Sequence, residues 1–245
     1  MSTTLAPSRT VTARDPKGTK FVSIVEAAYN KAGLSEDEAQ RVNDTPGLAD
    51  LIGTFIADNR LTDKYKNEEV KSTYGYLSGY QRPRPIADQV ATLRRLFPKL
   101  GSCNESLASE AVPDGAEGHF AIPRWQQIAS TYNEAVQIVL CLLKSAYGGH
   151  FVNYHEGGLG PDRLRQSRKK ADAFETLARA QEGNDILVVL VQFGFRHRGK
   201  SVRRARVVMG GNEFGLGAFE IGIMLLTHPD RLKDFNDLWI DGAGR

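Results

Sequence analysis

The chain has 245 residues, enough for one large domain or two small ones. With 41% hydrophobic and 25% charged residues it has the composition of an ordinary globular protein, and its formal net charge of +3 is too small to indicate a class of partner. No apolar run approaches the roughly 20 residues that span a bilayer, which excludes a helical membrane protein. We therefore expect no membrane partner.

The N-terminal residues 1–20, "MSTTLAPSRTVTARDPKGTK", have no apolar core, so they do not resemble a secretory signal. Ser, Thr and four cations surround a single acid there, and we expect a disordered basic tail. The two cysteines, Cys103 and Cys141, make no CxxC pair and do not indicate a disulfide framework. A cytoplasmic location is therefore expected.

Residues 21–100 are predicted to be helical. The stretch "KFVSIVEAAYNKAG" repeats apolar residues with the period of a helix face and ends at Gly33. Ser35 and Glu38 have the spacing of a capping box, which predicts a short helix directly after Ser35.

A third helix is predicted to start at Thr45 as N-cap and Pro46 as first residue. Its apolar stripe comprises Leu48, Leu51, Ile52, Phe55 and Ile56. Three short helices with tight turns also suit a helix-turn-helix DNA reader, but the third helix is acidic, which argues against a position in a DNA groove.

The segment "YGYLSGYQRPRP" (74–85) interleaves tyrosines and arginines with prolines, so no regular element is expected. An extended linker whose tyrosines pack on their own domain is the preferred interpretation, and stacking on nucleobases is the alternative. A helix follows from Ile86. Residues 101–118 are polar, acidic and rich in small side chains, which predicts a loop or domain boundary.

Residues 119–245 are predicted to form an α/β region. Its expected elements are a helix at 130–147, a helix from Pro161 to about Ala180, a buried strand at 185–193, a short helix capped by Ser201, a strand or helix at 219–226, and a last strand at 237–241. The predicted fold class is α+β or α/β. A helical N-terminal half precedes a small mixed sheet with flanking helices in the C-terminal half.

The stretch "GFRHRGKS" (194–201) follows the buried strand and matches G-x-x-x-x-G-K-[ST], the pattern of phosphate-binding P-loops. A nucleotide-binding enzyme is one alternative, in which Gly194 and Gly199 shape the loop, Lys200 contacts the outer phosphates and Ser201 holds Mg²⁺. Nucleotide and Mg²⁺ are expected as cofactors only in this alternative. The chain after Ser201 leaves space for about one more βα unit, fewer than such enzymes use.

The same stretch opens a basic block without acids. Its cations are Arg196, Arg198, Lys200, Arg203, Arg204 and Arg206. Our leading hypothesis is that this strand-loop-helix binds nucleic acid or another phosphate-rich polyanion, because guanidinium groups match phosphate oxygens. Arg163, Arg165 and Lys169 would supply secondary contacts. A third hypothesis is a structural or assembly protein, in which the block pairs with the acidic residues of 212–241 in the same chain, a second copy or a partner protein.

Whether the chain is an enzyme is left open. The five histidines do not have the spacing of a metal-ligand set, so no metal site is expected. Carboxylates near the basic block would suit metal-dependent phosphodiester cleavage, and the residues concerned are Glu213, Glu220 and Asp241.

Overall fold

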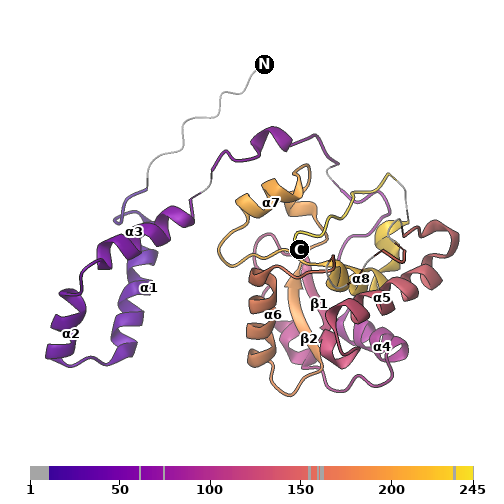
Figure 1. Ribbon diagram of the computed structural model, residues 1–245, viewed down its shortest axis with the longest axis horizontal. Coiled ribbons are helices and arrows are strands. Elements are labelled where there is room, and N and C mark those ends of the chain that lie inside the picture. Colours follow the sequence, from indigo (N-terminus) through magenta and orange to yellow (C-terminus); the bar gives the residue numbers. More distant parts are fainter. Residues whose placement is uncertain are drawn as a thin grey trace. The chain divides into compact units, whose positions relative to one another are not determined.

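The computed structural model describes residues 11–60, 62–73, 75–153, 156–158, 160, 163–233 and 236–244. The chain divides into two compact units, 1–60 and 61–245 (Figure 1). Residues 1–10 of the predicted tail lie outside the described residues. Within the part of the chain that is described, no helix has both the length and the apolar composition needed to cross a membrane.

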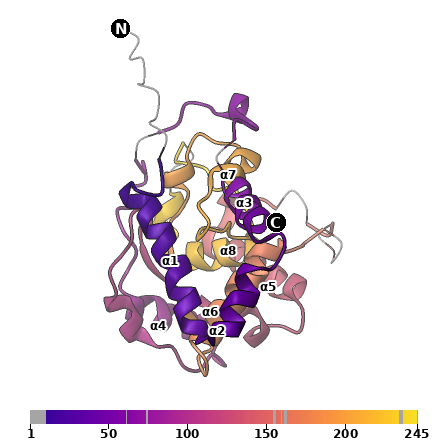
Figure 2. The same cartoon turned by 90° about the vertical axis from the view of Figure 1, so that its left-hand side faces the viewer.

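The first unit contains three helices, α1 (Pro16–Ala32), α2 (Glu36–Asn43) and α3 (Leu48–Asp58) (Figure 2). Helix α1 begins inside the region predicted as a tail, with Pro16 in its first turn, and ends at Gly33 in the left-handed conformation, as predicted. The predicted capping box is confirmed, because the Ser35 Oγ accepts from the Glu38 amide and the Glu38 carboxylate accepts from the Ser35 amide.

The predicted start of the third helix at Thr45 is wrong. The Thr45 hydroxyl donates to the Arg41 carbonyl oxygen at 2.8 Å, so it closes the preceding helix and cannot cap the next one. Gly47, with a φ of 85°, is the N-cap of α3 instead. The left-handed conformation at this position is one that glycine adopts without strain.

The second unit contains the remaining regular elements. Its helices are α4 (Ile86–Leu96), α5 (Tyr132–Tyr147), α6 (Arg168–Ala180), α7 (Val202–Val208) and α8 (Ala218–Thr227), and its strands are β1 (Gly118–Pro123) and β2 (Ile186–Val191). Short 3-10 helices occupy Lys66–Glu68, Glu105–Ser109, Trp125–Gln127, Gly148–His150, Phe195–His197 and Pro229–Leu232.

The sheet consists of β1 and β2, which pair antiparallel from Gly118 opposite Val191 to Pro123 opposite Ile186. An isolated parallel bridge joins Cys103 to Ile186. The structure is thus mostly helical, with a small sheet among helices in the C-terminal half, which confirms the predicted fold class. The segment 101–118 lies within the second unit, where the Gly101 amide donates to Asp185 at 2.8 Å.

The structure resolves or corrects three predicted elements of the second unit. The ambiguous stretch 219–226 is helical, within α8. The helix predicted from Pro161 begins at Arg168, because the Ser167 side chain caps it; Pro161 itself lies outside the described residues. The strand predicted at 237–241 is wrong, since the Asp237 carboxylate accepts from the amides of Leu77 and Leu238 in place of a strand ladder.

The hydrophobic core of the second unit lies around the sheet. Helices α4 and α8 pack on β1, α6 packs on β2, and α5 packs on α8 (Figure 1). Apolar residues without solvent exposure come from α4, α5, α8 and both strands and include Leu93, Phe120, Val136, Val139, Ile186 and Ile223. Burying these side chains supplies the main stabilisation, at about 25 cal/mol per Å² of apolar surface.

Two ion pairs are buried within this core. The Lys170 ammonium contacts Glu220 at 2.8 Å and the Tyr132 hydroxyl at 3.0 Å, and burial holds the pKa of Lys170 below its usual value although Glu220 opposes the shift. The Glu220 carboxylate also accepts from the Gly217 amide at the start of α8. Arg231 pairs with Asp237 at 3.2 Å, with neither side chain exposed.

Candidate functional site

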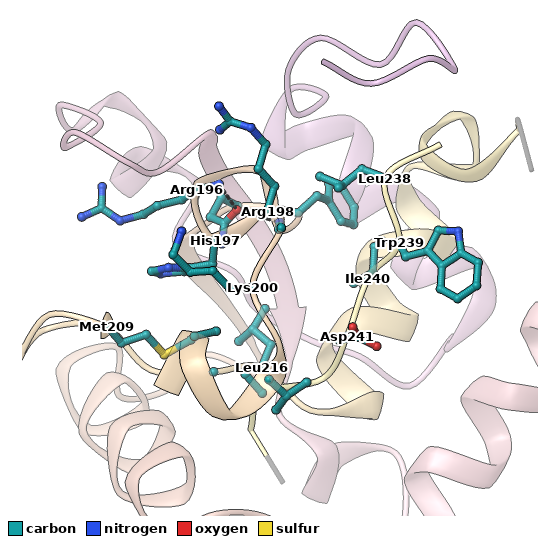
Figure 3. Close-up of a pocket in the computed structure, with 18 of the residues that line it drawn as sticks. Arg196, His197, Arg198, Lys200, Met209, Leu216, Leu238, Trp239, Ile240 and Asp241 are labelled. Atoms are coloured by element: carbon teal, nitrogen blue, oxygen red, sulfur yellow. Dashed lines mark hydrogen bonds between the residues drawn. The ribbon is translucent and has the colours of Figure 1, made fainter. Parts of the chain in front are cut away.

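A cleft of about 880 Å³ opens where β2 ends, within the second unit. One wall is the connection from β2 to α7 (192–201), and the facing wall is the C-terminal segment 236–243 (Figure 3). Apolar side chains line its interior, namely Met209, Leu216, Ile221, Met224, Leu238 and Ile240. Its volume lies in the range of about 300–1,000 Å³ that small-molecule sites occupy.

The loop that matches the P-loop pattern is folded on itself. The Gln192 side-chain oxygen accepts from the amides of Gly194 and Arg196 at 2.6 and 3.2 Å. The amides of Arg198 and Lys200 donate to carbonyl oxygens of Phe195 and His197, each at 3.3 Å. Since these backbone donors are used within the loop, they do not form the amide cradle that holds phosphate in a P-loop.

Gly199 and Ser201 contact a segment far away in the sequence. The Val70 amide donates to the Gly199 carbonyl oxygen at 2.6 Å, and a Cβ at position 199 would lie 2.3 Å from the Val70 carbonyl oxygen. The Ser201 hydroxyl donates to the Glu68 carboxylate and accepts from the Arg204 amide at 3.1 Å, which confirms its predicted role as helix cap.

The second half of the basic block is paired inside the unit. Arg203 contacts Glu68 at 2.5 Å, and Arg204, only 8% exposed, contacts Glu69 at 2.9 Å. The hydrogen bond from Arg204 lowers the pKa of Glu69. Arg206 donates to the Ala243 carbonyl oxygen at 2.8 Å. These three arginines therefore join α7 to the segment 62–70 and to the C-terminal segment.

The first half of the block forms a different environment. Arg196, Arg198 and Lys200 meet Lys71 around a hollow of about 260 Å³ beside the cleft, and we call these four side chains the cation cluster. None of the described residues that line this hollow is acidic. The Arg198 guanidinium lies over the Phe195 ring, 4.3 Å from its centroid, and donates to the Phe195 carbonyl oxygen at 3.0 Å.

A carboxylate lies on the other side of Arg196. Glu213 contacts the Arg196 Nε at 2.5 Å and lies 3.6 Å from the His197 Nε2, and it accepts from the Gly210 amide at 2.7 Å. Burial lowers the pKa of His197, and the Glu213 charge opposes that shift. His197 lines the cleft, and its burial favours the neutral ring there.

The three carboxylates predicted for metal chemistry do not converge. Glu213 lies beside the loop, Asp241 lies on the opposite wall (Figure 3), and Glu220 is buried against Lys170. In the described ranges, no group of three or more His, Cys, Asp or Glu side chains is placed to hold a metal ion. The three carboxylates are therefore not brought together as the metal-dependent cleavage considered from the sequence would require.

The predicted secondary contacts lie apart from the cation cluster. Arg163 and Arg165 precede α6, and Lys169 is in its first turn, and none of the three lines the cleft or the hollow. Sequence reasoning missed two residues that do belong to this region. Lys71 joins the cation cluster from the segment before α4, and Trp239 lies on the cleft wall with its indole 75% exposed and directed away from the loop (Figure 3).

No family model, no curated protein and no solved structure matches the chain.

Proposed function

We propose that this chain binds nucleic acid or another phosphate-rich polyanion, with phosphate at the cation cluster of Lys71, Arg196, Arg198 and Lys200. The observation that supports this proposal is the hollow itself, which four cations line without an acid. Glu213 pairs with Arg196 from outside the hollow, and a phosphate group inside it would contact the same cluster of cations. Arginine offers paired donors to phosphate oxygens, and lysine adds a mobile point charge.

The surroundings favour a ligand longer than a single phosphate. The cleft beside the hollow has room for one unstacked nucleobase. Trp239 lies on the far wall with its exposed indole directed away from the loop, so it offers a stacking surface to a strand that continues past that wall (Figure 3). Stacking of a base on an aromatic side chain contributes about 1–3 kcal/mol in single-strand complexes. A single strand is therefore the form of nucleic acid that this geometry favours.

A mononucleotide is the second candidate, because the volume of the cleft suits a ligand of that size. In this candidate the side chains of the cation cluster contact the phosphates, since the amides of Gly194, Arg196, Arg198 and Lys200 already donate within the loop. The Mg²⁺ and the catalytic activity considered with the P-loop pattern belong to this candidate only.

The test is a titration of a labelled single-stranded oligonucleotide with the full chain, followed by fluorescence anisotropy at low and at physiological salt. Binding is expected to weaken with salt. The variant Lys71→Gln/Lys200→Gln is expected to lose about tenfold or more in affinity and to reduce the slope of log K against log salt by about 1.4, or 0.7 for each lost phosphate contact.

The matched control is Lys99→Gln/Lys233→Gln, which removes the same charge from exposed positions outside the hollow. This control is expected to bind like the original chain apart from a small change in long-range attraction. Equal losses in both variants, or no binding by the original chain, contradict the proposal. Binding of a fluorescent ATP analogue without oligonucleotide binding supports the mononucleotide in its place.

A further inference from the structure

The first unit has helices but no core. None of its described residues is buried, although its sequence is rich in apolar side chains. The exposed ones are Val11, Val22, Ile24, Val25, Tyr29, Val42, Leu48, Leu51, Phe55 and Ile56. Short helices are marginal in water without a packed apolar face, and so few residues rarely form a domain alone. These three helices need a covering partner.

The exposed side chains are arranged in stripes. Val22, Val25 and Tyr29 follow the i, i+3, i+7 spacing along α1, and Leu48, Leu51 and Phe55 repeat that spacing along α3. Residues with this spacing share one face of a helix. Leu51 is 71% exposed and Phe55 59% exposed, so the middle of the α3 stripe is open.

We propose that the partner is a second copy of this chain, and that α1 and α3 form a homodimer interface. In the described part of the second unit, the exposed large apolar side chains are scattered over separate segments, at Val70, Leu77, Val112, Ile138, Val152, Leu190 and Trp239. The apolar side chains that do gather in that unit line the cleft, which is a hollow and not a helix face. The gathered surface that matches the α1 and α3 stripes is the same pair of stripes on another copy.

The charges of the first unit fit a two-fold arrangement. Arg14, Lys17 and Lys20 lie at the start of α1 beside one acid, Asp15, whereas Glu36, Asp37 and Glu38 open α2 after a single cation, Lys31, in the last turn of α1. Because α1 has 17 residues and is about 25 Å long, the net positive and the net negative charge lie at opposite ends of it. A two-fold axis across α1 places the basic end of one copy beside the acidic end of the other.

Light scattering and sedimentation equilibrium on the full chain test the interface. The original chain is expected to have twice the chain mass, and Leu51→Glu/Phe55→Glu is expected to be monomeric at the same concentration. Val112→Glu/Val152→Glu adds the same charge at exposed apolar positions of the second unit and is expected to remain dimeric. A full chain that stays monomeric over the whole concentration range overturns the proposal, whatever else covers the helices.

Charge-reversal variants distinguish a weakened interface from a loss of helix stability. Lys17→Glu/Lys20→Glu places acids near the N-terminus of α1, where they favour the helix, so weaker dimers cannot be attributed to loss of α1. The dimer is expected to weaken by about tenfold or more, since two ion pairs are lost on each side of the two-fold axis. Mixing this variant with Glu36→Lys/Asp37→Lys is expected to restore the dimer as a heterodimer, and failure of the mixture to associate counts against the arrangement.

Discussion

Helices α3 and α4 have the same length, eleven residues each, and opposite surroundings. Helix α4 buries Ile86, Val90 and Leu93 against the sheet, although Arg94 and Arg95 make its sequence the more polar of the two. Helix α3, "LADLIGTFIAD", buries nothing. Apolar content therefore does not decide which helix enters a core. What decides it for α4 is a second surface to pack on, which the sheet supplies within 61–245.

The largest effect on stability is expected inside the second unit, from loss of the buried Lys170–Glu220 pair. Lys170→Met leaves the Glu220 carboxylate buried without its cation, and loss of one partner of a buried pair costs about 3–5 kcal/mol. Urea unfolding at neutral pH measures the change. The double variant Lys170→Met/Glu220→Gln removes both charges and keeps an acceptor for the Gly217 amide, so it is expected to recover most of the loss. A single variant as stable as the original chain would refute the structural role of the pair.

The next prediction compares the same substitution in the two units. Leu93→Ala removes a side chain without solvent exposure from α4 and is expected to lower the free energy of unfolding of the second unit by about 2–5 kcal/mol. Leu51→Ala removes an exposed side chain from α3 and is expected to leave that unfolding transition in place. Thermal unfolding followed by near-UV circular dichroism reports on the second unit. Equal shifts in both variants would show that α3 shares its core.

The smallest predicted effect is a pH dependence of the stability of the second unit, which arises from His228. His228 is fully buried, its Nε2 accepts from the Arg84 amide at 2.9 Å, and its Nδ1 lies 3.1 Å from the Met224 carbonyl oxygen. This arrangement fits the neutral ring with its proton on Nδ1. Burial lowers the pKa of His228 from 6.5 to about 4.

The sign of the effect follows from proton uptake. Between pH 6.5 and about 4 the unfolded chain binds a proton at His228 that the folded chain does not bind, so stability falls as the pH falls through this window. Above pH 6.5 both states are neutral and the residue contributes no pH dependence. The loss between pH 7.5 and pH 5 is expected to amount to about 2 kcal/mol, since one pKa unit corresponds to about 1.4 kcal/mol and pH 5 lies about 1.5 units below the pKa of the unfolded chain. Unfolding at pH 7.5 and pH 5 is compared with His228→Gln, whose pH dependence should be smaller by that amount.

The elements that the sequence predicted correctly depend on local patterns. The helix ending at Gly33, the capping box of Ser35 and Glu38, the cap at Ser201 and the strand before Gly194 are each specified by residues within a few positions of one another. The errors arise where a distant or competing contact decides. Thr45 bonds backwards to Arg41, and Asp237 is held by Leu77 and Arg231, so neither segment forms the element that its own pattern favours.

The cation cluster could not be fully predicted from the sequence either, because a distant segment completes it. Three of its members are neighbours in the sequence, but Lys71 joins them from another segment, and no local signal connects the two. The acids that pair with the basic block also come from different places. Glu213 lies in the acidic region considered for such pairing, whereas Glu68 and Glu69 precede the block by more than a hundred residues. A charge count along the chain therefore overestimates the cations that remain for a ligand.

The segment 68–70 contacts the loop 194–201 at Gly199 and Ser201, and this contact alone could maintain part of the P-loop pattern. Selection that acts only on that contact would keep a glycine at 199, where a Cβ meets the Val70 carbonyl oxygen, and a hydroxyl at 201, which Glu68 accepts from. Gly194 would be kept as well, since its φ of 108° strains any other residue. Folding alone can thus account for three of the four residues that define the motif, namely Gly194, Gly199 and Ser201. Only a substitution at Lys200 tests whether the motif is maintained for phosphate binding.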